Sequence, residues 1–508
     1  MPIFDGVRIA RPRLNRFDLS HEYKASFNMG ELIPAMCEEV LPGDRFRVRS
    51  EIMLRFSPML APIMHRVDVY THYFFVPNRI IWDDWEDFIT GGEDGTEAPV
   101  WPHFSTSGLE SGSTTTVGGL PDYLGLPIIP SVPAESVLVS ALPFRAYTEI
   151  FNEYYRDQTL RTEVPNSKTS GLQSAYQNTS LRTRAWERDY FTSALPWTQR
   201  GAAVSLDATI NYKNVSDVVR DDTDVSVGNV FINPNTTSPP SALAATAMTG
   251  AGTGGRIENL ESIGIDINSL RQSNALQKWL EKAARIGSRY KEQLLGMFGV
   301  VSPDGRLQRP EYLGGGKQHV MISEVLQTAE GASLPVGQTL GHGISVGATN
   351  QFSRRFTEHG FVLAIVSVLP KTSYHQGIHR MWSRSDKFDY YFPDFAHLGE
   401  QAIEEKELFY DETTTGGADT WGYQSRYAEM KYCNSRIAGD FRSSLNYWHM
   451  GRTFTSVPPL AAAFVESDPT HRIFANTTPT DHKMYMQCYH NFSALRPIPI
   501  FSDPKLIP

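Results

Sequence analysis

The chain has 508 residues, which is enough for two or three ordinary domains or for one domain with very large insertions. Hydrophobic residues make up 41% and charged residues only 20%, a balance that excludes a highly charged, disordered polymer. The formal net charge of -9 argues against a protein that condenses nucleic acid by itself, because such proteins carry a basic surplus. With 39 glycines and 32 prolines, the composition favours a loop-rich β protein over a helical bundle.

Four segments have the pattern of β-strands. Residues 45–56 read RFRVRSEIMLRF, with hydrophobic side chains at every even position except Ser50 and mostly charged ones at odd positions, so one face enters a core. Residues 67–76 are rich in aromatic and β-branched residues, which suits a sheet interior. Residues 360–369 form a nearly continuous apolar run, and residues 484–491 alternate again. Strong strands near both ends of the chain predict one β-sandwich with long inserted loops.

Two segments have a helical pattern, and a third differs from its surroundings. Residues 80–89 predict a short helix that stops at the glycines that follow it. Residues 270–298 predict a longer amphipathic helix, which Gly287 weakens. Residues 202–264 are dominated by small, polar and turn-forming residues, and we interpret them as an exposed insertion.

The cysteines and the apolar runs bound the compartment in which the protein is made. Cys37, Cys433 and Cys488 are far apart, which argues against a disulfide framework and a structural zinc site. We expect them to be reduced, buried thiols. The first residues lack the apolar core of a signal peptide, and no apolar run approaches the roughly 20 residues of a membrane helix. The sequence therefore predicts no export by a signal peptide and no membrane insertion.

Long sequence segments along nearly the whole chain resemble those of one family. Residues 18–89 begin DLSHEYKASFNMGELIPAMCEEVLPGD. The later segments are NEYYRDQ (152–158), RDYFTSALPWTQRG (188–201), FGVVSPDGRLQRPEYLGGG (298–316), FTEHGFVLAIVSV (356–368), HRMWSRSDKFDYYFP (379–393), AHLGEQAI (396–403) and GYQSRYAEMKY (422–432). In this order they resemble the major capsid proteins of microviruses, small bacteriophages with single-stranded DNA, and particularly the gokushovirus branch.

The resemblance implies a fold and an assembly. The expected fold is all-β with helical insertions, an eight-stranded antiparallel jelly roll with long loops that forms a single domain over residues 1–508. Copies of such a protein build a T=1 icosahedral capsid around a circular single-stranded DNA genome. Residues 202–264, which lie between two matching segments, are the candidate for a protrusion at the threefold axes; the alternative is an ordinary surface loop.

The resemblance also implies partners. A small basic DNA-binding protein of the phage would compact most of the genome, which is compatible with the net charge of -9. An internal scaffolding protein and a DNA pilot protein are implied on the same grounds, and the variable insertion would meet a host surface receptor. The protein would be assembled in the bacterial cytoplasm and end in the virion.

Two groups of residues are candidate contact sites. Arg8, Arg11, Arg13 and Arg16 form a basic N-terminal arm that could bind packaged DNA phosphates or the carboxylates of a neighbouring subunit. The second interpretation is favoured, because four arginines are few for a polyanion of genome length. Trp382, Arg384, Tyr390 and Tyr391 belong to residue types favoured at subunit interfaces, although aromatic rings also stack on bases of single-stranded DNA.

Nothing in the sequence predicts an enzyme. The chain has no nucleophile elbow, no phosphate-binding loop and no thiol–histidine signature. His375 and His379 have a spacing that could chelate a metal on a helix, but Gly377 between them makes a helix doubtful, and hydrogen bonding or stacking at a subunit contact is the favoured interpretation. No cofactor is expected, and a structural divalent cation between subunits stays open.

Two other functions fit a jelly roll. The chain could be a virion spike or decoration protein, which would form trimers or pentamers that do not close. It could also be a carbohydrate-binding or carbohydrate-active protein on a similar sandwich, which would have a sugar cleft.

Overall fold

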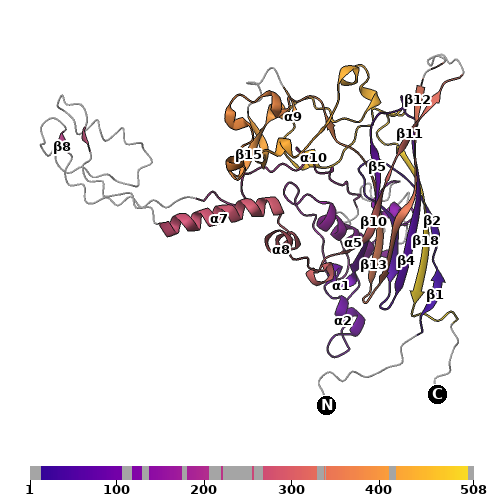
Figure 1. Cartoon of the computed structure of the whole chain (residues 1–508). Helices are drawn as coiled ribbons and strands as arrows, with labels where there is room; N and C mark the ends of the chain where they lie inside the picture. Colours follow the sequence, from indigo (N-terminus) through magenta and orange to yellow (C-terminus); the bar gives the residue numbers. More distant parts are fainter. Residues whose placement is uncertain are drawn as a thin grey trace. The chain divides into compact units, whose positions relative to one another are not determined.

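The structure is a computed structural model that describes residues 13–105, 117–128, 137–173, 180–204, 219–220, 255–256, 267–328, 337, 339–410 and 419–501. The chain divides into two compact units. One combines residues 1–198 with 286–508 and contains the two large sheets (Figure 1). The other comprises residues 199–285. Most of the predicted insertion 202–264 lies outside the described residues.

Each predicted strand is present. The segment 45–56 is strand β4 (Arg45–Phe56), in which even residues are buried and nearly all odd residues are exposed. The others are β5 (Val67–Pro77), β13 (Gly360–Pro370) and β18 (Met484–Arg496), each a little longer than its pattern indicated. Every residue of β13 is buried. An uninterrupted apolar run therefore indicated a strand that is covered on both faces.

Among the described residues, ten strands form two antiparallel sheets. The six-stranded sheet has the order β1, β18, β4, β12, β11, with β2 also paired to β18. The four-stranded sheet has the order β10, β5, β13, β3. The additional strands of the two sheets are β1 (Asn15–Asp18), β2 (His21–Phe27), β3 (Ile33–Val40), β10 (Glu311–His319), β11 (Met321–Leu326) and β12 (Thr339–Arg355).

Short strand pairs lie outside these sheets. They are β6 (His103–Ser105) with β7 (Leu138–Ser140), β8 (Val219–Arg220) with β9 (Gly255–Arg256), β15 (Glu400–Glu404) with β16 (Thr420–Ser425), and the parallel pair β14 (Ser373–Tyr374) with β17 (Ser435–Arg436).

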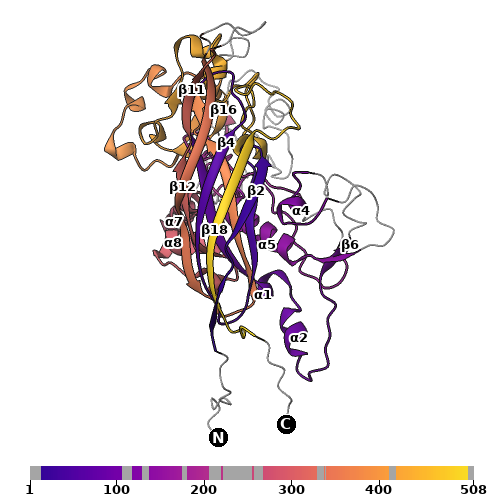
Figure 2. The same cartoon turned by 90° about the vertical axis from the view of Figure 1, so that its right-hand side faces the viewer.

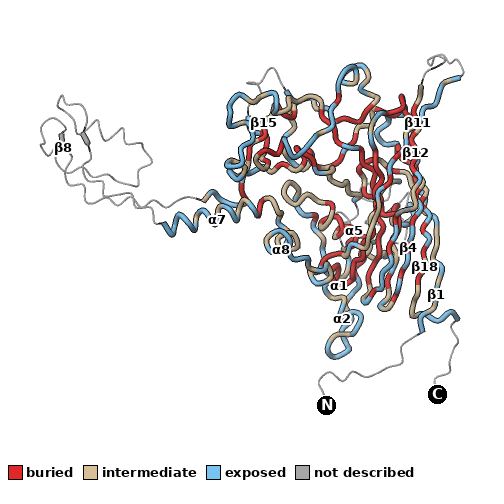
Figure 3. Tube along the Cα trace, in the orientation of Figure 1, coloured by how far each residue is buried: buried red, intermediate tan, exposed pale blue. Residues whose placement is uncertain are grey.

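The main core lies between the two sheets. The inward side chains of β4 and β18, such as Leu54 and Met486, pack against those of β5 and β13, such as Val69 and Val368. Figure 3 shows buried residues prevailing in the strands to the left of β4 and β18, whereas buried and exposed residues mix along β4 and β18. Each fully buried side chain of this size contributes roughly 1.5–3 kcal/mol to folding. The two faces therefore hold the layers together as a β-sandwich.

A second core covers the outer face of the four-stranded sheet. Phe74 of β5 and Leu363 of β13 pack there against buried side chains of helix α5, including Phe144 and Tyr147. The helices are α1 (Asn78–Ile81), α2 (Trp85–Thr90), α4 (Leu120–Tyr123), α5 (Leu142–Ile150), α7 (Ile267–Ile286), α8 (Tyr290–Phe298), α9 (Glu405–Leu408) and α10 (Ala462–Val465). The π-helix η1 (Phe151–Tyr155) continues α5 directly.

Both predicted helices are interrupted. The segment 80–89 divides into α1 and α2, because Trp82 is extended and buried, with its indole N–H donating to Ser170 Oγ at 2.8 Å. The segment 270–298 divides into α7 and α8 at Gly287, whose φ of +108° is incompatible with a continuous helix. Short-range periodicity indicated helices in both segments but did not predict these breaks.

A polar chain crosses the core and connects the sheets. Ser50 Oγ of β4 contacts His490 Nδ1 of β18 at 2.7 Å, and Tyr73 of β5 donates its hydroxyl proton to Ser50. The other ring nitrogen, His490 Nε2, lies 3.1 Å from the carbonyl oxygen of Ala35 in β3. This arrangement assigns the proton of a neutral imidazole to Nε2, since Nδ1 can then accept from Ser50.

The three cysteines are free, as expected, but they are not all buried. Cys488 is buried, Cys37 is partly buried and Cys433 is exposed. The expectation of a buried thiol was therefore wrong for Cys433, which lies just beyond the short helix η7 (Ala428–Met430) rather than in a sheet.

Candidate functional site

The described part of the N-terminal arm leads into strand β1 of the six-stranded sheet. Arg8 and Arg11 lie outside the described residues, and Arg13 is exposed two residues before β1 begins. Arg16 is exposed on β1, where its Nε donates to Ser493 Oγ at 2.9 Å. The pairing of β1 with β18 therefore brings one of the four candidate arginines next to the outward side chains of a central strand pair.

The second group of candidate residues lies in an exposed segment that is rich in aromatic side chains. Trp382 is 76% exposed, and Tyr390 and Tyr391 are each 54% exposed. We define the aromatic surface as the exposed residues Trp382, Phe388, Tyr390, Tyr391, Phe392 and Leu398. These side chains come from the short 3-10 helices η3 (Arg380–Trp382), η4 (Lys387–Asp389) and η5 (Pro393–Phe395) and from the residues that adjoin them.

Internal contacts fix the backbone beneath this surface. The Tyr427 hydroxyl donates to the Tyr390 carbonyl oxygen at 3.2 Å, and the Tyr427 ring lies 5.1 Å from that of Tyr391. Arg384 differs from its aromatic neighbours, because its guanidinium pairs with Glu429 at 3.3 Å and its side chain is only 14% exposed. Arg384 thus orders the segment from within, while the aromatic rings are presented to solvent.

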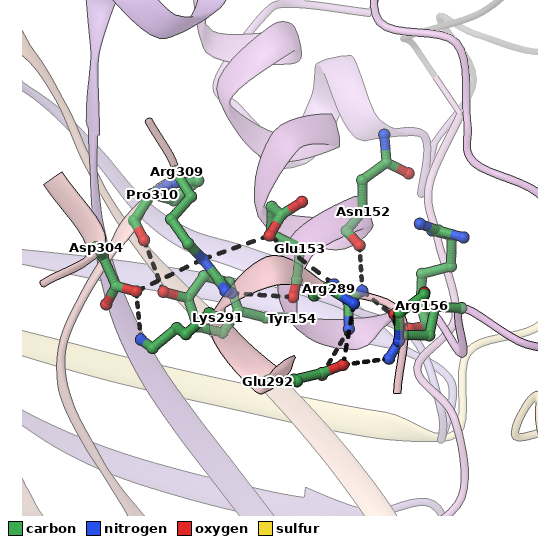
Figure 4. Close-up of polar contacts among 12 residues, drawn as sticks. Asn152, Glu153, Tyr154, Arg156, Arg289, Lys291, Glu292, Asp304, Arg309 and Pro310 are labelled. Carbon is green, nitrogen blue, oxygen red and sulfur yellow. Dashed lines mark hydrogen bonds and ion pairs between the residues drawn. The ribbon is translucent and has the colours of Figure 1, made fainter. Parts of the chain in front are cut away.

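An ion-pair network joins three segments that are distant in sequence (Figure 4). Glu153 of η1 lies between two cations, with Arg309 Nε at 3.3 Å and Arg289 Nε at 3.8 Å. Lys291 of α8 pairs with Asp304 of the 3-10 helix η2 (Asp304–Leu307), and Arg309 approaches the same carboxylate at 3.5 Å. These side chains are largely shielded from solvent, so the charges attract each other more strongly than surface pairs do.

Neutral contacts complete the network. Arg289 Nη2 donates to the carbonyl oxygen of Asn152 at 2.5 Å, and the Tyr154 hydroxyl donates to that of Pro310 at 2.6 Å. The Arg309 guanidinium lies 4.7 Å from the centre of the Tyr154 ring. Burial raises the pKa of the Tyr154 hydroxyl, which is therefore a hydrogen-bond donor at neutral pH. The arrangement satisfies charges internally and serves the fold.

Sequence reasoning missed this network. Its members come from the family-like segments 152–158 and 298–316 and from α8, which lies between them in the sequence. The only signal was the density of charged residues within these two segments. Nothing in either segment indicates that it contacts the other.

A pocket of about 650 Å³ contains further charged residues without forming a catalytic arrangement. Lys317 lies in it and pairs with Asp68 at 2.8 Å, and Lys371 pairs with Glu187 at 2.8 Å. The nearby lysines and the hydrogen bond from Tyr70 hold the pKa of Glu187 at about 2, despite its burial. These cations are already neutralised by carboxylates of the same chain.

The two candidate histidines are not on a helix. His379 precedes η3, and its Nδ1 accepts a hydrogen bond from the Met381 backbone N–H at 3.2 Å. The rings of His375 and His449 meet edge to face, with centres 6.0 Å apart and an interplanar angle of 76°. Across the part of the chain that the structure describes, no group of three or more His, Cys, Asp or Glu side chains could hold a metal ion. No helix in the same ranges is long and apolar enough to cross a membrane.

Comparisons with known proteins agree with the resemblance in the sequence. The family described as "Capsid protein (F protein)" matches residues 4–506. The capsid protein VP1 of Chlamydia phage 1, a gokushovirus, is 33% identical over 99% of this chain and 97% of its own length. The VP1 proteins of Bdellovibrio phage phiMH2K and Spiroplasma virus 4 are 34% and 29% identical, over 98% and 99% of this chain and 96% and 97% of their own lengths.

These matches confirm the predicted relationship to microvirus capsid proteins. The relatives are structural proteins of phage virions, which agrees with the prediction of a protein without catalytic activity. They give no support to a spike protein or a carbohydrate-active protein. Since a single family model extends over nearly the whole chain, this protein belongs to the phage capsid proteins of the F protein family.

Proposed function

We propose that copies of this chain assemble into a closed T=1 icosahedral shell around a circular single-stranded DNA genome. The observation that carries this proposal is the match of one capsid family over residues 4–506. A shell subunit acts by burying complementary surfaces against copies of itself around fixed symmetry axes. Each contact can be weak, because closure of the shell multiplies the contacts.

We further propose that the sandwich is an eight-stranded jelly roll. The eight strands, in chain order, are β2, β3, β4, β5, β10, β12, β13 and β18. One sheet then contains the first, eighth, third and sixth of them side by side, and the other contains the second, seventh, fourth and fifth. This alternation between sheets, with the first and last strands as neighbours, supports two interlocked Greek keys. Strands β1 and β11 extend the first sheet at its two sides.

The aromatic surface supports self-association. Its large rings are exposed in the isolated chain, although tryptophan and tyrosine contribute most when they are buried at the centre of an interface. The backbone beneath them is held by Tyr427 and Arg384, so little conformational freedom is lost on contact. We propose that a neighbouring copy covers Trp382, Tyr390 and Tyr391.

The remaining partners are proposals that the family relationship supports. They are the small basic DNA-binding protein, the internal scaffolding protein and the DNA pilot protein of the phage, with assembly in the host cytoplasm and no cofactor. Residues 202–264 are proposed to form the threefold protrusion that meets the host receptor. Shortening residues 235–258 should leave folding and assembly intact while particles lose attachment to host cells. Loss of soluble, folded protein would instead place the segment in the core.

The assembly proposal is tested by expressing the full chain with the scaffolding protein of the same phage. Sedimentation and electron microscopy should then reveal closed particles of one small diameter. Trimers or pentamers that never close would favour the spike alternative. A stable monomer that binds or cleaves glycans would favour the carbohydrate alternative and contradict the proposal.

A further inference from the structure

Six arginines lie on the outward face of the six-stranded sheet. Four of them project from β4 and alternate with its buried residues. Arg355 of β12 pairs directly with Arg45, and Arg16 of β1 pairs with Leu495, which is the partner of Arg45 on its other side. We call this surface the arginine face. It consists of Arg16, Arg45, Arg47, Arg49, Arg55 and Arg355, all of them exposed.

The charges of the arginine face are not neutralised within the described chain. None of its six guanidinium groups forms an ion pair with a carboxylate of the described residues, whereas Arg354 next to it does. The exposed carboxylates Asp18 and Glu51 are too few to balance it, and Glu22 already pairs with Lys24 at 3.0 Å. A chain with a net charge of -9 therefore concentrates positive charge on one sheet surface.

The strand register also places like charges opposite each other. Arg45 and Arg355 are direct cross-strand partners, and such side chains have Cβ atoms roughly 4.5–5.5 Å apart. Like charges in this position destabilise a sheet. A bound polyanion would remove this cost, so the arrangement is better suited to an occupied surface than to a bare one.

The arginine face is open to a large ligand. Figure 2 looks onto β2, β18, β4 and β12, and no described helix of the unit that combines residues 1–198 with 286–508 lies in front of them. The four-stranded sheet, by contrast, has its outer face covered by α5 and its neighbours. A pocket of about 610 Å³ opens on the arginine face, lined by Arg16, Arg45 and Arg47 together with Ser353 and Ser493.

The side chains beside the arginines indicate the chemistry of the ligand. Tyr485 and Tyr489 of β18 are 47% and 39% exposed on the same face, and Tyr485 lies directly opposite Arg55. Guanidinium groups bind phosphate oxygens in pairs of hydrogen bonds, and exposed aromatic rings stack on unpaired bases. An acidic protein segment would use the charges but not the rings. A single-stranded nucleic acid uses both.

We propose that the arginine face binds the packaged single-stranded DNA, with this side of the sandwich turned toward the interior of the shell. This inference rests on the proposed function, because it requires a shell around such a genome. The contacts go to phosphates and to base faces, so they are independent of sequence. The arm residue Arg16 takes part as a member of the sheet surface.

The test compares three forms of the full-length chain. The first is the natural protein, the second carries Arg45→Gln, Arg47→Gln and Arg55→Gln, and the third carries Lys at the same positions. Binding of a fluorescent thirty-nucleotide oligo-dT is followed by anisotropy at several salt concentrations. The Gln form should bind tens of times more weakly near 0.15 M salt, and its log–log salt slope should fall by about 2, since each phosphate contact contributes roughly 0.7. The Lys form should retain the slope.

A matched control removes the same charge elsewhere. Arg271, Lys278 and Lys282 are exposed on α7, and replacing all three with Gln changes the net charge equally while glutamine preserves helix propensity. This control should bind oligo-dT within a few-fold of the natural chain. Thermal melting of every form shows that the fold is retained.

A second readout uses particles formed with the phage scaffolding protein and packaging components. The Gln form should still close into shells, and the DNA content from their absorbance ratio should be reduced. Unchanged oligo-dT affinity and slope in the Gln form would overturn the inference, as would equal weakening by the α7 control. Tighter binding of a poly-glutamate peptide than of oligo-dT would assign the surface to an acidic protein. If even the natural chain forms no shells, the assembly proposal fails, while the oligonucleotide arm still tests the arginine face.

Discussion

His490 is a buried residue whose two ring nitrogens are both used. Ser50 and the carbonyl oxygen of Ala35 contact them from opposite sheets, and the His21 ring lies 5.1 Å away. A buried polar group without its partner costs about 1–3 kcal/mol. We therefore expect His490→Leu to destabilise the chain by about that amount, measured by chemical unfolding. His490→Gln keeps a donor and an acceptor and should cost less; equal losses would contradict the role of the hydrogen bonds.

The same residue predicts a pH dependence. Burial lowers the pKa of His490 from 6.5 to about 4, so between these values the unfolded chain binds a proton that the folded chain does not. The contribution of the neutral His490 ring to the free energy of unfolding is complete above pH 6.5 and is lost as the pH falls toward 4. This loss amounts to at most about 3 kcal/mol. His65 and His72 act in the same direction, and the raised pKa of Glu31, about 7, opposes them.

The contribution of His490 is isolated by comparison with the His490→Gln variant. The free energy of unfolding of the natural chain should fall more steeply between pH 6.5 and 4 than that of the variant. Parallel curves over this range would show that the histidine does not titrate as its burial requires.

At the scale of elements, Gly287 sets the boundary between α7 and α8. Its φ of +108° favours glycine, and an added Cβ would meet the side chains of Glu292 and Gln158, which bond to each other. Gly287→Ala should therefore destabilise the chain by about 1–3 kcal/mol in thermal or chemical unfolding. Gly299 after α8 has a φ of +70° and no atom within 4 Å of an added Cβ. Gly299→Ala should cost only about 1 kcal/mol; equal losses would exclude the contact with Glu292 and Gln158.

At the scale of the whole molecule, assembly should depend on side chains that the fold does not need. Trp382→Ala combined with Tyr390→Ala removes two exposed rings of the aromatic surface. The thermal midpoint should change little, while the protein concentration needed for shells, measured by light scattering, should rise at least tenfold. Ile128→Ala combined with Val137→Ala removes exposed apolar side chains elsewhere and is the control. Normal assembly of the aromatic variant would exclude this surface as a subunit contact.

The sequence alone determined the strands and the family. Alternation along β4 and the apolar run of β13 are local patterns, and each follows directly from which faces of a strand are covered. The long family-like segments were sufficient to predict a capsid protein, because they occur in order over most of the chain. The sequence predicted which segments are helical but not where each helix ends. The helices end because Trp82 is extended and buried and because Gly287 has a positive φ.

Only the tertiary structure decided which distant residues meet. Ser50 and His490 are 440 positions apart and contact each other because β4 and β18 pair in one register. Arg16 joins Arg45 and Arg47 through the pairing of β1 with β18, and Glu153 meets Arg309 because η1 lies against the segment after η2. The alternating arginines of β4 were visible in the sequence as a polar face. Their position beside two exposed tyrosines, on a surface that no described helix of the sheet-containing unit covers, depends on how the sheets pack, which periodicity along one strand does not specify.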